Sequence, residues 1–213
     1  MNRSLTLLHT SLLHIPVFDA LRDREHPGAV LHHVVRPALL ARARAAGPEA
    51  VVDELRGLLW EAGASGGTVL CTCSTVGGAA EALAGELGVA VLRVDRPMAA
   101  EAVRLGPRIV VLATLESTVG PTVELIREEA RAGGREVAVR TAVVPGAFDR
   151  FEAGDLDGSL ALVTAAADAY TRADTDVIVL AQVSMAGAAA PAGRSVPVLA
   201  GPALGLAAAL RME

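Results

Sequence analysis

The residues with the clearest chemical potential surround two cysteines in residues 70–78, Leu-Cys-Thr-Cys-Ser-Thr-Val-Gly-Gly. An apolar strand that ends at Cys73, followed by small residues, places this thiol at the start of a helix. Unpaired backbone N–H groups and the helix dipole favour a thiolate at such a position. We therefore predict that Cys73 is catalytic, beside Ser74 and Thr75 as carboxylate-binding neighbours. Cys71, two positions earlier, is expected to be a buried small hydrophobe, and a structural role remains the alternative for Cys73 as well.

Three other predicted strands also end in small polar residues, namely Thr10-Ser11, Thr114 with Ser117-Thr118, and Gln182 with Ser184. The separations from Thr10 to Thr114 and from Cys73 to Gln182 are both close to half of the 213 residues. This spacing indicates two similar lobes, each giving two strand ends to one cleft, because ligands of parallel sheets bind beyond the carboxyl ends of the strands. The alternative is that the hydroxyl residues only cap the helices that follow.

Short apolar runs alternate with segments rich in Ala, Glu and Arg, a pattern typical of α/β proteins with parallel sheets. The strands are expected at residues 5–9, 30–35, 69–73, 90–94, 109–114, 136–141, 177–181 and 196–199. The helices are expected at residues 48–62, 78–87, 99–105, 121–132, 156–170 and 205–210. Because the strands are continuously apolar, helices should cover both faces of each sheet. The expected fold is therefore α/β, with two Rossmann-like lobes related by a pseudo-twofold axis.

Composition excludes several classes of function. All 19 basic residues are arginines, so no lysine can form a Schiff base or an internal aldimine, or complete a Walker-A motif. A net charge of −5 with 2% aromatic residues argues against a nucleic-acid surface. Two cysteines are too few for an ordinary zinc site, and we expect no metal. Polar residues and Pro16 interrupt the N-terminal apolar run, which argues against a signal peptide. Prolines interrupt the apolar run after Val177, which argues against a membrane-spanning helix. We therefore expect a soluble cytoplasmic protein.

The sequence resembles the aspartate/glutamate racemase superfamily, which includes hydantoin racemase, maleate isomerase and arylmalonate decarboxylase. The resemblance runs nearly end to end and rests on five segments in order: residues 7–11, 73–77, 94–98, 111–118 and 177–185. It implies an N-terminal lobe of residues 1–98 with 196–213 and a second lobe of residues 99–195. It also implies a small carboxylate or dicarboxylate substrate, no cofactor and a homodimer.

In racemases of this superfamily two cysteines face opposite sides of the substrate α-carbon, and hydroxyl groups and backbone amides hold the carboxylate. By this resemblance Cys73 matches the first cysteine and Ser74 and Thr75 its carboxylate-binding neighbours. The other implied contacts are Thr10, Ser11, Thr114, Ser117, Thr118 and Ser184.

The second cysteine position holds Gln182, whose amide forms hydrogen bonds and does not carry protons near neutral pH. The sequence therefore leaves several hypotheses. Cys73 alone could perform acid–base chemistry in an isomerase, a decarboxylase or another lyase. It could instead be a nucleophile while Gln182 orients the substrate, or the protein could bind a small carboxylate as a sensor or regulator. A racemase with an unrecognised second base is the remaining hypothesis.

Overall fold

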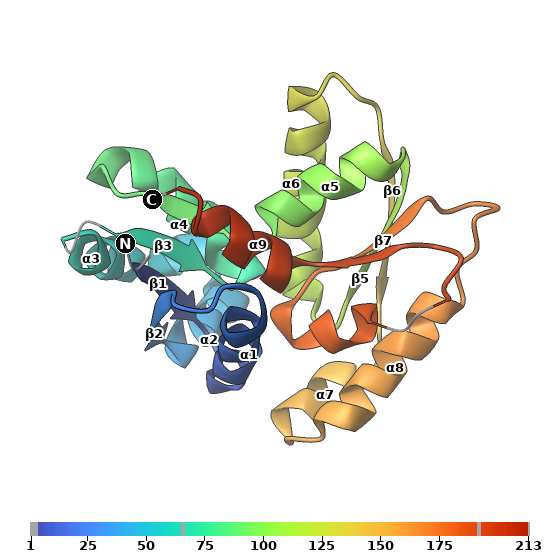
Figure 1. Ribbon diagram of the computed structural model, residues 1–213, viewed down its shortest axis with the longest axis horizontal. Helices are drawn as coiled ribbons and strands as arrows, with labels where there is room; N and C mark the ends of the chain where they lie inside the picture. Colours follow the sequence, from blue (N-terminus) through green and yellow to red (C-terminus); the bar gives the residue numbers. More distant parts are fainter. Residues whose placement is uncertain (1–3, 65–66, 191–192, 213) are drawn as a thin grey trace. The chain divides into compact units, whose positions relative to one another are not determined.

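A computed structural model describes residues 4–64, 67–190 and 193–212. The chain forms two compact units, of which the first comprises residues 1–94 with 202–213 and the second residues 95–201. Each unit holds one sheet of four parallel strands, and Figure 1 shows the elements of both. The α/β class with two parallel sheets is thus confirmed.

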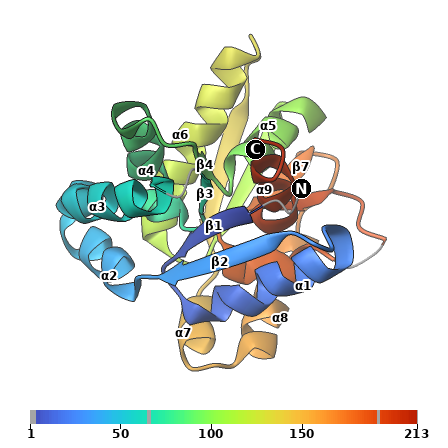
Figure 2. The ribbon, with the colours of Figure 1, turned by 60° about the vertical axis from the view of Figure 1, so that its left-hand side comes forward.

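The first unit contains strands β1 (Ser4–His9), β2 (Val30–Val35), β3 (Thr68–Cys71) and β4 (Val91–Arg93) in the sheet order β2-β1-β3-β4. Its helices are η1 (Leu12–His14), α1 (Ile15–Glu25), α2 (Pro37–Ala46), η2 (Pro48–Val51), α3 (Val52–Gly63) and α4 (Ser74–Leu87). The C-terminal helix α9 (Gly201–Ala209) joins this unit from Pro202 onward. Figure 2 shows α1 running alongside β2.

The second unit contains strands β5 (Arg108–Ala113), β6 (Ala138–Val143), β7 (Val177–Leu180) and β8 (Val198–Ala200) in the order β6-β5-β7-β8. Its helices are α5 (Arg96–Leu105), α6 (Glu116–Ala132), α7 (Ala147–Glu152), α8 (Leu156–Asp168) and η3 (Val183–Ala189). Counted along the chain, both sheets have the order second, first, third, fourth strand. The repeat suggested by the half-length spacing is therefore a repeat of topology.

The apolar pattern predicts how deeply the strands are buried, and the inner strands β3 and β7 differ from the outer strands β2 and β6, although the outer strand β4 is buried as well. Every residue of β3 and β7 is buried, whereas the outer strands β2 and β6 alternate between more and less exposed residues. An inner strand has helices on both faces and neighbours on both edges, so it needs an unbroken apolar run. An outer strand keeps one edge open to solvent and tolerates polar residues such as His32 and Arg140.

Three short helices were missed in the sequence, because α1, α2 and α7 lie in segments expected to be irregular. Pro16 and Pro37 both occupy the first helical turn, where proline costs no hydrogen bond. Helix α6 is longer than predicted. It was expected to start at Pro121, but it begins at Glu116 and contains Pro121 in its interior. Proline at that point removes one intrahelical hydrogen bond, but the helix continues through it.

The end of the chain also differs from expectation. Strand β8 was expected in the N-terminal lobe with residues 196–213, but it pairs in parallel with β7 of the second sheet. Only the segment from Pro202 returns to the first unit, where α9 lies directly against the end of β4. At Gly205 a Cβ atom would lie 2.6 Å from the carbonyl oxygen of Val94, so this contact requires glycine.

Candidate functional site

The candidate residues of the first unit follow the carboxyl ends of β1 and β3. These strands pair in parallel, with Leu8 opposite Cys71, so the two segments that follow them leave the sheet at the same edge. Thr10 is buried directly after β1. Ser11 caps η1, because its Oγ accepts the hydrogen bond from the Leu13 N–H at 3.3 Å. For Ser11 the capping alternative is therefore observed.

Helix α4 begins immediately after Cys73, four residues earlier than the sequence predicts. Cys73 has extended backbone angles and is the N-cap residue, and its side chain makes no capping hydrogen bond. Glycine at position 77 was taken as part of a loop before the helix. Instead it makes room for a neighbour, since a Cβ at Gly77 would lie 3.1 Å from Nε of Arg93.

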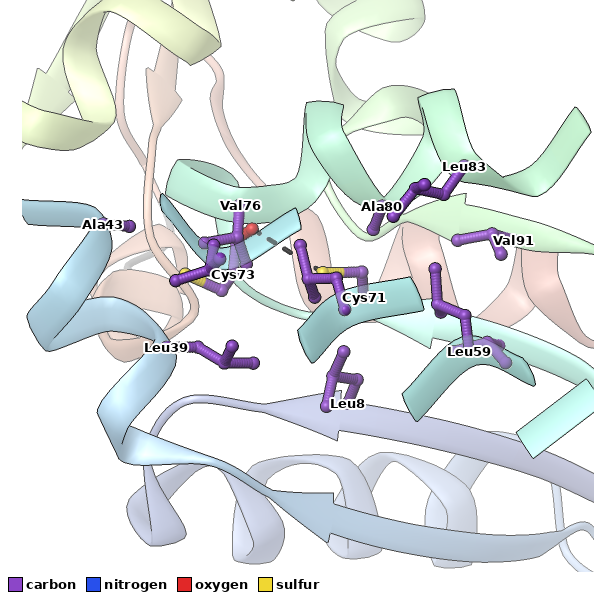
Figure 3. Packing of buried hydrophobic residues seen from close by; sticks show 13 residues of the cluster. Leu8, Leu39, Ala43, Leu59, Cys71, Cys73, Val76, Ala80, Leu83 and Val91 are labelled. Carbon is purple, nitrogen blue, oxygen red and sulfur yellow. Dashed lines mark hydrogen bonds between the residues drawn. The ribbon is translucent and has the colours of Figure 1, made fainter. Parts of the chain in front are cut away.

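The two cysteines differ in their surroundings, although both are free thiols within the apolar cluster of the first unit (Figure 3). Cys71 has no exposed surface, and its thiol lies 3.8 Å from the Cys73 carbonyl oxygen as a hydrogen-bond donor. Cys73 keeps 7% of its surface exposed, and Figure 3 shows it on the side of the cluster near Leu39 and Ala43. Cys71 is the buried hydrophobe predicted from the sequence.

A polar atom without a partner lies in the first turn of α4. The hydroxyl of Thr75 is buried, with 6% of the residue exposed, and has no hydrogen-bond partner among the described residues. A buried hydroxyl normally finds a partner, so the hydrogen-bonding capacity of this one is unused among the described residues. The N-terminal N–H groups of a helix also lack intrahelical acceptors, and they attract negative charge. Thr75 and the helix start together form a site suited to a carboxylate.

The corresponding position in the second unit is held by Gln182, which is the N-cap of η3 and lies two residues beyond β7, as Cys73 lies two residues beyond β3. Its side-chain oxygen accepts hydrogen bonds from the N–H of Thr114 at 2.6 Å and of Leu115 at 3.3 Å. The Thr114 hydroxyl donates to the same oxygen at 3.0 Å. Because backbone N–H groups only donate, the facing atom is the carbonyl oxygen, and the amide NH₂ remains free to donate elsewhere.

The other candidate hydroxyls of the second unit belong to Thr118, Ser117 and Ser184, and they differ in their hydrogen-bond partners and burial. Thr118 donates to the Leu115 carbonyl oxygen at 2.7 Å, so it is engaged within its own helix turn. The Ser117 hydroxyl is buried without a partner among the described residues, at the second position of α6, as Thr75 is of α4. Ser184 is half-buried in η3. Thr118 Oγ1 also lies 3.4 Å from the Gln182 side-chain oxygen, so the structure brings Thr114, Thr118 and Gln182 together.

Two histidines of the first unit are buried, His9 and His14; the sequence offers His14 as an alternative base or a partly exposed structural residue, and it gives His9 no role. Burial lowers the pKa of His9 to about 3, with the neighbouring His14 and His33 adding to the effect, and lowers the pKa of His14 to about 4. Both are neutral near pH 7. His9 is the last residue of β1, and its ring nitrogens lie 2.8 Å from Thr72 Oγ1 and from the His33 ring. The only sequence signal was a polar residue at the end of an otherwise apolar strand.

Neither a metal-binding cluster nor a membrane-spanning helix is found in the part of the chain that the structure describes. No group of three or more His, Cys, Asp or Glu side chains there is arranged to hold a metal ion. Among those same residues, no helix is long and apolar enough to cross a bilayer.

Comparison with known proteins identifies the family. The model of the Asp/Glu/Hydantoin racemase family matches residues 16–209, which is most of the chain. The chain belongs to this family. No match was found among curated protein sequences.

Solved structures of the same fold are distant in sequence. An aspartate racemase from Picrophilus torridus is 15% identical with a TM-score of 0.69, over 97% of this chain and 92% of that one. An allantoin racemase from Pseudomonas fluorescens is 18% identical with a TM-score of 0.64, over 98% and 90% of the two chains. A double mutant of arylmalonate decarboxylase in its liganded form is 19% identical with a TM-score of 0.59, over 99% and 92%. These likenesses support the shared fold.

The hydrogen bonds of Gln182 predict a stability difference between two substitutions. Gln182→Met removes the acceptor of two backbone N–H groups, and we expect it to lower the free energy of unfolding by about 1–2 kcal/mol. Gln182→Glu keeps an oxygen at this position and should retain most of the stability. Urea unfolding followed by circular dichroism compares the two, and equal stability of both variants would show that the Gln182 oxygen is unimportant to the fold.

The low pKa values of His9 and His14 predict acid sensitivity. A histidine whose pKa is lower in the folded state stabilises the fold above its unfolded value of 6.5 and loses that contribution as the pH falls toward the folded value. Each of the two should cost about 1.4 kcal/mol per pH unit below 6.5, until about pH 4 for His14 and about pH 3 for His9.

Urea unfolding at pH 7.0, 5.5 and 4.5 measures this loss. In His14→Gln the decrease should be about half as steep, whereas His32→Gln, at an exposed position, serves as the matched control and should follow the unmodified protein. A free energy of unfolding that stays constant from pH 7.0 to 4.5 would contradict buried neutral histidines.

Proposed function

We propose that this protein is a cofactor-independent enzyme that moves a proton at the carbon next to the carboxylate of a small acid, with Cys73 as its acid–base group. Membership of a family of racemases supports an enzyme of this general class. The observation that carries the specific proposal is the combination at the start of α4. A thiol at the N-cap stands two residues from a buried hydroxyl without a partner.

The proposed substrate contact begins with the carboxylate. Its oxygens would accept hydrogen bonds from the Thr75 hydroxyl and from N–H groups in the first turn of α4, which is 14 residues long. These donors also stabilise the enediolate-like charge that develops when the neighbouring carbon loses a proton or carbon dioxide. The same contacts therefore bind the ground state and lower the barrier of the step.

Cys73 would carry the proton in that step. In an isomerisation the thiolate takes the proton from carbon, the electron pair remains in the enediolate, and the thiol returns a proton to carbon. In a decarboxylation carbon dioxide leaves, and the thiol protonates the carbanion that remains.

Gln182 would act as a neutral group in this chemistry. Its carbonyl oxygen is already engaged by Thr114 and Leu115, so the amide NH₂ is the part left to contact a ligand. An amide does not accept a substrate proton near neutral pH, and so we propose an isomerase or a decarboxylase with one thiol in preference to a racemase with two. A small carboxylate is the proposed ligand, and the cytoplasm the proposed location.

A second candidate function is a sensor that binds a small carboxylate without turning it over. The observation that favours it is the burial of Cys73, of which 7% is exposed and which belongs to the apolar cluster of its unit. Nucleophilic attack by Cys73 on an unsaturated acid is a further chemical possibility for the same thiol.

Hydrogen exchange in heavy water tests the enzymatic proposal. Small mono- and dicarboxylic acids are incubated with the protein, and loss of the hydrogen next to the carboxylate is followed by proton NMR. We expect at least one acid to exchange, and we expect Cys73→Ala to lower the rate by about 100-fold or more, as removal of a general acid–base group does. Decarboxylation appears in the same spectra as a new product.

Cys71→Ala is the matched control, because it removes the neighbouring buried thiol and should leave exchange within a few-fold of the unmodified rate. Equal exchange in Cys73→Ala and the unmodified protein would overturn the role of Cys73. Saturable binding of an acid without exchange or product would favour the sensor.

A further inference from the structure

The two cysteines of the first unit point to the same face of its sheet. Side chains along an extended chain alternate between the two faces, so residues two positions apart point the same way. Cys71 and Cys73 both belong to the apolar cluster of this unit, and Figure 3 shows both among its side chains. Thr72, which stands between them, is outside this cluster, and its hydroxyl lies 2.8 Å from the His9 ring.

The backbone between the cysteines sets how far apart they are. The N–H of Thr72 continues the strand ladder by donating to the Leu8 carbonyl oxygen at 3.0 Å, and Cys73 has extended angles, φ −115° and ψ 116°. An extended chain rises about 3.3 Å per residue, so the two Cα atoms are about 6.6 Å apart. Disulfides join Cα atoms that are about 4.4–6.8 Å apart, so this separation is compatible with a bond between the two sulfurs.

The Cys71 thiol already lies against Cys73. Its Sγ atom is 3.8 Å from the Cys73 carbonyl oxygen, to which it donates. That carbonyl group and the Cβ of Cys73 are attached to the same Cα atom, so the Cys71 sulfur is directed at the residue that it would bond. Rotation about the Cα–Cβ bond of Cys73 moves the second sulfur without moving the backbone.

Solvent reaches the two thiols differently. Cys73 keeps 7% of its surface exposed, directly before α4, whereas Cys71 has no exposed surface. A small oxidant such as hydrogen peroxide therefore meets Cys73 first, because oxidation of a thiol follows its exposure. Cys71 is shielded from the oxidant, but it lies inside the protein beside the residue that is attacked.

We propose that hydrogen peroxide oxidises Cys73 and that Cys71 then closes a reversible disulfide with it. In the first step the Cys73 sulfur attacks one peroxide oxygen, the O–O bond breaks, and a sulfenic acid and water form. In the second step the Cys71 sulfur attacks the Cys73 sulfur, the S–S bond forms, and the sulfenic hydroxyl leaves as water with the Cys71 proton. The two thiols together lose two electrons, and the peroxide is reduced to two molecules of water.

The disulfide protects Cys73 and switches it off. A sulfenic acid that meets no second thiol is oxidised further to a sulfinic acid, which thiols do not reduce, whereas thiols do reverse a disulfide. While the bond is present, Cys73 has no proton to take or give. Loss of activity in the oxidised form rests on the proposed function above, whereas formation of the disulfide does not.

Peptide mapping tests the disulfide in the full-length protein. Trypsin cleaves after arginine, and residues 57–93 form one peptide that contains both cysteines and no methionine, so methionine oxidation does not obscure the result. The folded protein is treated with excess hydrogen peroxide, quenched with catalase, unfolded, alkylated with iodoacetamide and digested. We expect this peptide to lose about 2 Da and to take up no alkyl group, and dithiothreitol to restore both thiols.

Two variants separate the roles of the thiols. Cys71→Ser leaves Cys73 without a second thiol, so we expect no disulfide and a gain of about 32 Da, that of a sulfinic acid, in the same peptide. Cys73→Ser is the matched control, and its buried Cys71 should stay reduced and take up one alkyl group after unfolding. Cys71→Ala repeats the first test if Cys71→Ser does not fold. Oxidation of Cys71 in Cys73→Ser as fast as that of Cys73 in Cys71→Ser would contradict the assigned order.

The outcomes separate this inference from the proposed function. If the peptide of the unmodified protein keeps both thiols, gains a sulfinic acid or is linked to a second chain, the proposed disulfide is overturned, whether or not any acid exchanges hydrogen. A reversible disulfide within the peptide, together with no hydrogen exchange of any acid, would leave the disulfide in place while the proposed enzyme fails. If both hold, the disulfide form should exchange no faster than Cys73→Ala, and dithiothreitol should restore the rate.

Discussion

All strands in both sheets run parallel, and this constraint determines where polar groups must be satisfied. The carboxyl ends of parallel strands meet at one edge, and each helix that follows starts there with backbone N–H groups that no residue of its own helix can accept. Such an edge needs an acceptor, either from the chain or from a ligand. The two units of this protein meet that need differently.

In the second unit the acceptor is part of the chain. The Gln182 oxygen takes the N–H groups of Thr114 and Leu115, and it does so at the position equivalent to Cys73 in the first unit. In the first unit this position holds the thiol of Cys73, which makes no capping bond. The hydroxyls of Thr75 in the first unit and of Ser117 in the second are both left without a partner among the described residues. Two units of the same topology thus differ chemically at matching positions, which is why we propose ligand chemistry centred on the first.

Much of this arrangement could be predicted from the sequence, because it depends on patterns of buried strands. The unbroken apolar runs identify β3 and β7, and the half-length spacing of Cys73 and Gln182 anticipates the repeated topology. The start of α4 and the Gln182 bonds could not be placed, since both depend on contacts far apart in the sequence. Gly77 looks like a loop residue until the Arg93 side chain is seen beside it.

The contact between His9 and His33 was hidden for the same reason. His9 and His33 are 24 residues apart, and Asp19 lies on α1, a helix that the sequence did not predict. Nothing local indicates that these side chains converge, because their contact is created by the pairing of β1 with β2 and by the packing of α1 beside them.

The central claim is that the start of α4 holds a carboxylate. Titration of the nitrogen-15-labelled protein with small carboxylic acids, followed by amide NMR, measures it directly. The account predicts saturable shifts at the amides of Ser74, Thr75 and Val76, and binding about tenfold weaker in Thr75→Val, which keeps the shape and removes the hydroxyl. Shifts confined to other parts of the chain, or unchanged affinity in Thr75→Val, would contradict it.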